Sequence, residues 1–230
     1  MLNNSPKDLK TLAYVLRRTN YGEADRILNL ITPEGKVSAM AKGIRKANSK
    51  LAGAVEMFTL SEMNLHFGKS DLATLTGAKM IKFHSGILKD LGRMEKASEF
   101  LKEVNRAAEM VDSPEFFEIL DKSLTALGSG MDQTMVESWF LLNLARAMGE
   151  QINLYVDVDG EKLDADLVYF WNEQEMGLEV SERGMIGAEM IKLLRLMWTT
   201  DLEVVWRVKN NEKYAAEILK IAQAVKKVVK

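Results

Sequence analysis

The sequence predicts an α+β fold in which a small β-barrel precedes a helical domain. Residues 1–84 contain short apolar runs separated by turn residues, whereas after Ser85 apolar residues recur at every third or fourth position. The first pattern is typical of β-strands and the second of amphipathic helices. We therefore predict two domains, 1–84 and 85–230, that meet directly near residue 84.

Five strands are predicted in the first domain. Thr32-Pro33-Glu34-Gly35 is typical of a tight turn, because proline fixes φ and glycine adopts positive φ. Met63, Leu65 and Phe67 alternate with polar residues, as in a strand with one buried face. The predicted strands are 11–19, 24–32, 37–41, 56–67 and 72–82. Five strands in about eighty residues favour a closed barrel of the OB-fold type, with a small sandwich or an SH3-like barrel as the alternative.

Helices are predicted for most of the second domain. An apolar stripe starts at Leu88, and a second helix follows Ser113 as N-cap and Pro114 in its first turn. Further helices are predicted at about 133–148, 188–198, 201–208 and from an Asn210/Asn211 cap to the C-terminus. Residues 152–171 interrupt the helical pattern, and Asp159-Gly160 within them is typical of a hairpin turn.

The composition, 47% hydrophobic and 28% charged, is typical of a globular protein and excludes several kinds of site. The chain has no cysteine, so it has no disulfide, thiolate zinc site, iron–sulfur cluster or cysteine nucleophile. Its two histidines, His66 and His84, are too few for a multi-histidine metal site. Met1–Lys10 does not have the apolar stretch of a signal peptide, and no apolar run approaches the roughly 20 residues that cross a bilayer. We expect a cytoplasmic protein with no cofactor, metal or membrane contact.

No catalytic constellation is recognisable, and we expect that the protein is not an enzyme. Gly68-Lys69-Ser70 matches only the end of a phosphate-binding loop and is better explained as a hairpin turn. The acidic residues from Asp157 to Asp166 do not have the glycine and glutamate of an EF-hand and favour a solvated turn. An enzyme would require a pocket of converging titratable groups, which the sequence does not reveal.

Charge is distributed unevenly along the chain. The net charge of −2 combines 13 Lys and Arg against 7 Asp and Glu in residues 1–84, a net +6, with 18 against 26 in residues 85–230, a net −8. Such asymmetry favours a nucleic-acid surface on the barrel, and the acidic charge of the helical half confines this surface to the barrel and its edge. The predicted DNA-binding residues are Arg17, Arg18, Arg26, Lys42, Arg45, Lys46 and Lys50.

The strongest part of this signal is the loop Lys42–Lys50, because no acidic residue lies between Lys36 and Val55. Contacts of Lys and Arg with phosphates release counterions, so binding is expected to depend on salt and to be independent of sequence. A basic loop that only solubilises the barrel is the alternative. Tyr14 and Tyr21 are candidates for stacking on bases, whereas Phe58 and Phe67 are expected in the core.

Three strings in this region resemble the N-terminal domain of the bacterial recombination mediator family RecO. They are Tyr21-Gly22-Glu23-Ala24-Asp25-Arg26, Thr32-Pro33-Glu34-Gly35-Lys36 and Ala41-Lys42-Gly43-Ile44-Arg45-Lys46. Ser49-Lys50-Leu51-Ala52-Gly53 and Phe58 continue the similarity. The resemblance extends over nearly the whole chain and is most specific over residues 11–60, through the order and spacing of these strings.

The resemblance implies an OB-fold joined to a helical domain, in a protein associated with the bacterial nucleoid. It implies binding to single- and double-stranded DNA, annealing of complementary strands, and, with the partner RecR, loading of RecA on DNA coated by the protein SSB. The resemblance places six basic residues in the DNA-facing strand and loop region, namely Arg17, Arg26, Lys42, Arg45, Lys46 and Lys50. The alternative is a structural motif in which Arg26 pairs with Glu23 or Asp25. The acidic tail of SSB would bind the helical domain, where Lys192 and Arg195 beside Ile191, Leu194 and Met197 are candidates for the pocket.

The chain departs from many members of this family in one respect. These relatives have four zinc-binding cysteines around the hairpin that here extends over about 152–177, and this chain has none. We expect an inserted zinc-free hairpin that is held by packing of Tyr155, Tyr169 and Trp171. As an alternative function we consider a protein–protein adaptor whose OB-fold contacts only a protein partner.

Overall fold

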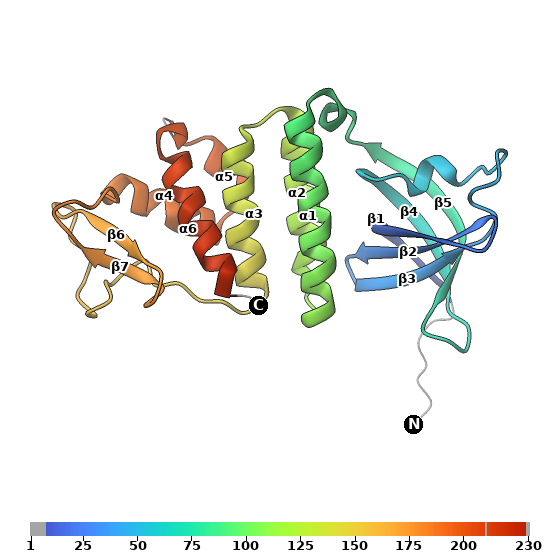
Figure 1. Cartoon of the computed structure of the whole chain (residues 1–230), viewed down its shortest axis with the longest axis horizontal. Helices are drawn as coiled ribbons and strands as arrows, with labels where there is room; N and C mark the ends of the chain where they lie inside the picture. The colour runs from blue at the N-terminus through green and yellow to red at the C-terminus, as the bar shows by residue number, and fades with distance from the viewer. Residues whose placement is uncertain (1–7, 210, 229–230) are drawn as a thin grey trace. The chain divides into compact units, whose positions relative to one another are not determined.

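The computed structural model describes residues 8–209 and 211–228 and divides the chain into two compact units, Met1–Gly130 and Met131–Lys230. The strands of the first unit are β1 (Asp8–Tyr21), β2 (Asp25–Thr32), β3 (Gly35–Ala41), β4 (Thr59–His66) and β5 (Ala73–Phe83). Its helices are η1 (Ala52–Val55), η2 (Ser85–Lys89), α1 (Leu91–Met110) and α2 (Glu115–Ser129) (Figure 1). The five predicted strands are therefore confirmed.

The strands form a closed barrel in the order β1-β2-β3-β5-β4, with β4 pairing back to β1. All pairs are antiparallel except β3 and β5, which pair in parallel only at Ala39–Ala73 and Met40–Thr74. The β2–β3 turn is the predicted one, since Gly35 has a φ of +112° and its carbonyl accepts a hydrogen bond from Thr32 Oγ1. This arrangement confirms the OB-fold prediction.

The interior of the barrel is filled mainly by aliphatic side chains from alternate strand positions. The buried members are Ala13, Val15, Leu28, Leu30, Ala39, Ala41, Ile44, Val55, Met63, Leu65, Ala73 and Leu75. Tyr14, Leu16 and Ile31 are buried as well, although strand alternation directs Tyr14 to the outer face. Since α1 packs against β1 and α2 against β2, the two helices cover this outer face. Strand β1 is thus buried on both of its faces.

A buried hydrogen-bonded cluster joins β1, the end of β5 and α2. The Tyr14 hydroxyl donates to Asp121 Oδ1 at 2.7 Å and lies 2.7 Å from His84 Nε2. A phenol has only one hydrogen, so His84 Nε2 must carry the proton that it donates to the Tyr14 oxygen. Burial, followed by the hydrogen bond to Asp121, raises the pKa of Tyr14, and the phenol stays protonated. Burial and the nearby Lys82 charge lower the pKa of His84 to about 4.

The division into compact units differs from the boundary predicted at residue 84. The first unit extends to Gly130 and includes α1 and α2, which pack against each other and against β1 and β2 of the barrel. The domain assignment from the sequence, 1–84 and 85–230, follows the change in secondary structure and stays a prediction. The predicted apolar stripe is wrong at its start, since Leu88 lies in η2 rather than in α1, and both Leu88 and Leu91 are exposed.

The second unit contains a helical core and a small sheet. Its elements are α3 (Gln133–Ala147), β6 (Tyr169–Asn172), β7 (Gly177–Val180), α4 (Ala188–Thr199), α5 (Leu202–Trp206), η3 (Asn211–Tyr214) and α6 (Ala215–Val228) (Figure 1). Helix α3 packs against α4 and α6, and its Asn143 side chain donates to the Met197 carbonyl at 2.9 Å. The predicted cap residue Asn210 lies outside the described residues.

The segment between α3 and α4 forms two successive turns rather than one hairpin. Gly160, with a φ of +84°, occupies the predicted turn, but only an isolated bridge pairs Val156 with Lys162 around it. The paired strands β6 and β7 follow, and Tyr169 anchors them as expected, because it is buried and its hydroxyl accepts a 2.8 Å hydrogen bond from Asp164 N. Tyr155, by contrast, is exposed.

Within the described ranges, no helix is long and apolar enough to cross a membrane.

We predict that the stability of the protein falls as the pH is lowered from about 6.5 to 4. In this window the unfolded chain protonates His84, whose ordinary pKa is 6.5, whereas the folded chain, with a pKa of about 4, does not. Urea unfolding at about pH 7 and pH 5 should show a loss of up to about 2 kcal/mol from this group. His84→Gln should flatten the pH dependence.

His66→Gln is the matched control, because His66 lies on the exposed face of β4, where its Nδ1 is 2.8 Å from Asp8 Oδ1. This variant should retain the wild-type loss between pH 7 and pH 5. Equal pH profiles of the wild type and His84→Gln would contradict the assignment.

Candidate nucleic-acid interface

The loop Lys42–Lys50 is held on the β1–β2 turn by backbone hydrogen bonds. Asp25 Oδ1 accepts from Gly43 N at 2.6 Å, and Arg45 N donates to the Ala24 carbonyl at 2.9 Å. Gly43 has a φ of +63°, where a side chain would be strained, and Ile44 is buried in the barrel core. The loop is therefore a fixed part of the barrel surface.

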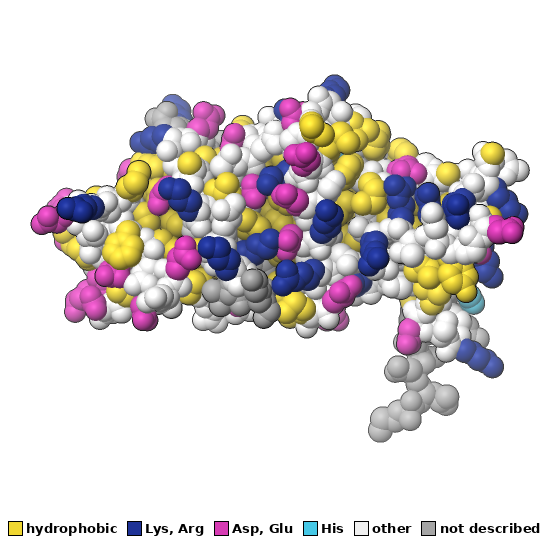
Figure 2. All heavy atoms as spheres, in the orientation of Figure 1, with side chains coloured by type: hydrophobic (Ala, Val, Ile, Leu, Met, Phe, Trp, Pro, Cys, Tyr) yellow, Lys and Arg dark blue, Asp and Glu magenta, His cyan; other side chains and the backbone are white. Residues whose placement is uncertain are grey.

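The cations of this loop project from a fixed backbone. Lys42, Arg45, Lys46 and Lys50 are exposed, and in the part of the chain that the structure describes none of them forms an ion pair. Arg45 uses one guanidinium nitrogen to donate to the Gly22 carbonyl at 3.3 Å. Figure 2 shows several Lys and Arg side chains over the upper part of the barrel in this view. This surface can bind a polyanion without first breaking a salt bridge.

The tightly spaced acidic and basic residues of the β1–β2 turn have separate roles. Asp25 holds the loop, while Arg26 Nε donates to Asn20 Oδ1 at 3.2 Å instead of pairing with Glu23 or Asp25. The predicted alternative, Arg26 paired with Glu23 or Asp25, is therefore not found among the described residues, and Asp25 instead has a structural role through Gly43. Arg26 stays half-exposed on β2, next to the loop.

The two candidate stacking residues have different environments. Tyr21 is 55% exposed at the end of β1, where a base can reach it. Tyr14 is fully buried, and its hydroxyl is bonded to Asp121, so the prediction that Tyr14 stacks on bases is wrong. Helices α1 and α2 cover the strand face that alternation alone leaves open. Phe58 is buried and Phe67 packs against the barrel core, as expected.

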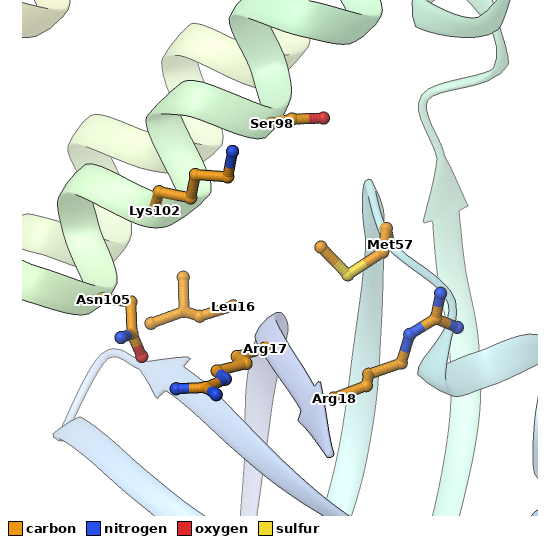
Figure 3. A pocket seen from close by; sticks show the side chains of 7 residues that line it. All are labelled: Leu16, Arg17, Arg18, Met57, Ser98, Lys102 and Asn105. Carbon is orange, nitrogen blue, oxygen red and sulfur yellow. The ribbon is translucent and has the colours of Figure 1, made fainter. Parts of the chain in front are cut away.

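A groove of about 660 Å³ lies between β1 and α1 within the first unit (Figure 3). Its lining consists of three cations, two small polar side chains and two apolar side chains, namely Arg17, Arg18, Lys102, Ser98, Asn105, Leu16 and Met57. The pairing register of β1 with β2 shifts between Val15 and Arg17, as at a β-bulge. Such an irregularity redirects side chains, and here Leu16 is buried whereas Arg17 is exposed.

Carboxylates near the groove are already paired. Arg18 contacts Glu56 at 2.6 Å, and Lys36 contacts Glu109 at 2.9 Å. The Lys36 hydrogen bond and charge lower the pKa of Glu109, with a further hydrogen bond from Asn105. No ion pair within 4.0 Å involves Arg17 or Lys102 among the described residues. The groove therefore retains two cations without a direct ion-pair partner in this part of the chain, although the charge of Arg17 also helps to lower the pKa of Glu109.

Sequence reasoning identified Arg17 and Arg18 but missed the contribution of α1. Ser98, Lys102 and Asn105 lie four and three residues apart, so they share one face of the helix beside the apolar stripe. The sequence shows this spacing, but it does not show that this face of α1 lies opposite β1.

The proposed tail-binding pair in α4 is engaged within its own unit. Lys192 pairs with Glu189 at 2.8 Å, and Arg195 donates to the Leu154 carbonyl at 2.8 Å with its guanidinium 4.5 Å from the Tyr155 ring centroid. The expected apolar floor of Ile191, Leu194 and Met197 is buried in the core. The structure thus brings no open apolar floor to these two cations, and their role stays a prediction.

The acidic turn and the histidines form no metal site in the described ranges. Asp157 Oδ1 accepts hydrogen bonds from Asp159 N and Glu161 N, which is the solvated turn expected from the sequence. No group of three His, Asp or Glu side chains is placed to bind a metal ion in this part of the chain.

Comparison with known proteins connects this geometry to a family. Residues 7–84 match the family described as Recombination protein O N terminal, and residues 99–225 match Recombination protein O C terminal. The chain is similar to a protein named DNA repair protein RecO from Heliobacterium modesticaldum, with 32% identity over 214 residues, 87% of this chain and 77% of the relative. A RecO of Dehalococcoides mccartyi is 29% identical over 93% of this chain and 87% of its own length. The chain therefore belongs to the RecO family, whose members are DNA repair proteins with a role in recombination.

Proposed function

We propose that the protein binds single- and double-stranded DNA through the barrel and anneals complementary single strands without catalysing a covalent step. The observation that carries this proposal is the loop Lys42–Lys50, whose four cations are exposed, unpaired in the described residues and fixed to the barrel by Asp25. Membership of a DNA repair family supports it.

The proposed mechanism is electrostatic. Two single strands repel each other through their phosphates, and Lys and Arg side chains lower this repulsion by replacing condensed counterions. Because the cations contact phosphates rather than base edges, binding is independent of sequence. Once the repulsion is reduced, base pairing between the two strands nucleates.

The family relationship also supports protein partners. We propose that the chain acts with RecR to load RecA on single strands coated by SSB, and that it works at the bacterial nucleoid. The helical residues Lys192 and Arg195 remain the proposed contacts for the acidic SSB tail. To bind the SSB tail, Lys192 would have to release Glu189, and Arg195 would have to release the Leu154 carbonyl.

An adaptor function is the second candidate, and one observation favours it. Residues 80–91 expose five large apolar side chains, Met80, Ile81, Phe83, Leu88 and Leu91. Exposed apolar groups of this size are typical of protein contacts. In this alternative the barrel contacts only a protein, and the basic loop keeps the barrel soluble.

We predict that Lys42→Glu/Arg45→Glu/Lys46→Glu lowers the rate of annealing of SSB-coated oligonucleotides by at least about tenfold, because three phosphate contacts become repulsive. Lys162→Glu/Arg183→Glu/Arg207→Glu is the matched control, since these exposed residues of the second unit give the same change in net charge. Equal rates for the wild type and the loop variant would remove the loop from the interface.

Two single substitutions in the β1–β2 turn separate loop geometry from charge. Asp25→Ala removes a negative charge, which alone would strengthen DNA binding, but it also releases Gly43 from its 2.6 Å hydrogen bond. We expect the affinity to fall a few-fold. Glu23→Ala removes the same charge from an exposed position and should leave the affinity equal or higher. Tighter binding by Asp25→Ala would show that the loop position is unimportant.

Fluorescence anisotropy with labelled single-stranded DNA distinguishes the mediator from the adaptor. If the four loop cations each contact a phosphate, the affinity should fall about fiftyfold between roughly 50 and 200 mM salt. An adaptor would show no binding even at the lower salt concentration.

A further inference from the structure

We propose that the groove between β1 and α1 binds one nucleotide of a single strand, with its base against Met57 and Leu16 and its two flanking phosphates at Lys102 and Arg17. This inference rests on the proposed function, since it assigns a second part of the DNA surface. It adds a helix to an interface that the sequence places on the barrel alone.

The first support is the chemistry of the lining. Met57 is half-buried and Leu16 is buried, and together they give the groove an apolar floor. A thioether is polarizable and packs well against aromatic rings, so Met57 suits the face of a base. Ser98 Oγ donates to the Met94 carbonyl at 2.7 Å, and its lone pairs can accept a hydrogen bond from a base.

The second support is the placement of positive charge. Figure 3 shows Lys102 extending from α1 into the open space and Arg17 lying on the β1 side, toward Asn105, with Leu16 between the two cations. Within a strand, each base has a phosphate on either side, so two separated cations around an apolar floor match one nucleotide. Arg18 is held by Glu56 at 2.6 Å, and Glu109 by Lys36, so neither carboxylate compensates Arg17 or Lys102 as an ion-pair partner.

The third support is continuity with the basic loop. Strand β1 extends from the groove at Leu16–Arg18 to Tyr21, and the loop Lys42–Lys50 is bonded to the turn that follows Tyr21. A strand bound in the groove can therefore continue along β1 to the loop cations. The groove volume of about 660 Å³ lies within the range of small-ligand sites, roughly 300–1,000 Å³.

The first experiment measures the salt dependence of binding to a thymidine oligonucleotide of about 15 nucleotides, with the full chain. Each phosphate contact contributes about 0.7 to the slope of log affinity against log salt for single strands. Lys102→Ala and Arg17→Ala should each reduce the slope by about this amount. Arg106→Ala is the matched control, because Arg106 is an exposed cation one turn beyond Lys102 that does not line the groove, and it should leave the slope unchanged.

The second experiment locates the base. In protein labelled with ¹³C at the methionine methyl groups, the Met57 signal is assigned with Met57→Leu. A thymidine oligonucleotide should shift this signal through the ring current, whereas an abasic strand of equal charge should not. Thymidine monophosphate has a single phosphate and is expected to cause the same shift only at higher concentration. If thymidine monophosphate and the oligonucleotide shift the Met57 signal equally at the same concentration, the groove binds free nucleotides. The recognised group is then still a nucleotide, but it does not come from a DNA strand.

The outcomes separate this inference from the proposed function. If the oligonucleotide binds, but Met57 does not shift and Lys102→Ala behaves like Arg106→Ala, the groove assignment is overturned and the basic loop still binds DNA. If the oligonucleotide does not bind at all, both proposals fail. A Met57 shift caused by an acidic peptide of Asp and Leu residues, and not by the oligonucleotide, would assign the groove to a protein partner and overturn the nucleotide.

Discussion

The hydroxyl of the buried Tyr14 joins the barrel to helix α2 through a hydrogen bond. It donates to Asp121 of α2 and accepts from His84 at the end of β5, so three elements meet at one buried oxygen. Loss of any partner would leave a buried polar group unsatisfied. Because the helices are held on the outer face of β1, Lys102 of α1 lines the same groove as Arg17. Helix α1 is also bonded to the barrel directly, since Asn29 Nδ2 and Lys36 Nζ both donate to Asn105.

Five of the seven acidic residues in residues 1–84 have structural partners, and this helps to explain how the barrel surface stays cationic. Four of them contact the side chains of other residues, in the pairs Asp8–His66, Glu34–Thr11, Glu56–Arg18 and Glu62–Lys10. A fifth, Asp25, binds the backbone of Gly43. None of these five carboxylates forms an ion pair with the loop Lys42–Lys50, so its charge is available to a polyanion. The excess of +6 in residues 1–84 is thus concentrated at the loop rather than averaged over the barrel.

The sequence was sufficient for the barrel and insufficient for its surroundings. Alternation identified the buried positions Met63 and Leu65, and the spacing of turn residues identified all five strands. Alternation gave the wrong environment for Tyr14. The continuous apolar run Tyr14-Val15-Leu16 is instead typical of a strand that is buried on both faces. The groove could not be predicted, because it is formed by residues from β1, the segment before β4 and α1, which only the tertiary packing brings together. Asn29 and Lys36, which donate to Asn105 of α1, take part in that packing.

Net charge per domain is a poor guide to the surface of a helix. Residues 85–230 have a net charge of −8, which suggests that the helical half repels DNA. Yet the groove-lining residues Ser98, Lys102 and Asn105 include no acid, and the acid that follows them on this face, Glu109, is paired with Lys36. Side chains on different faces of a helix have different surroundings, so one face can be cationic although the domain as a whole is acidic. The packing and ion pairs of each helix face therefore decide which faces can bind DNA, and in the proposed interface α1 extends the DNA surface beyond the barrel.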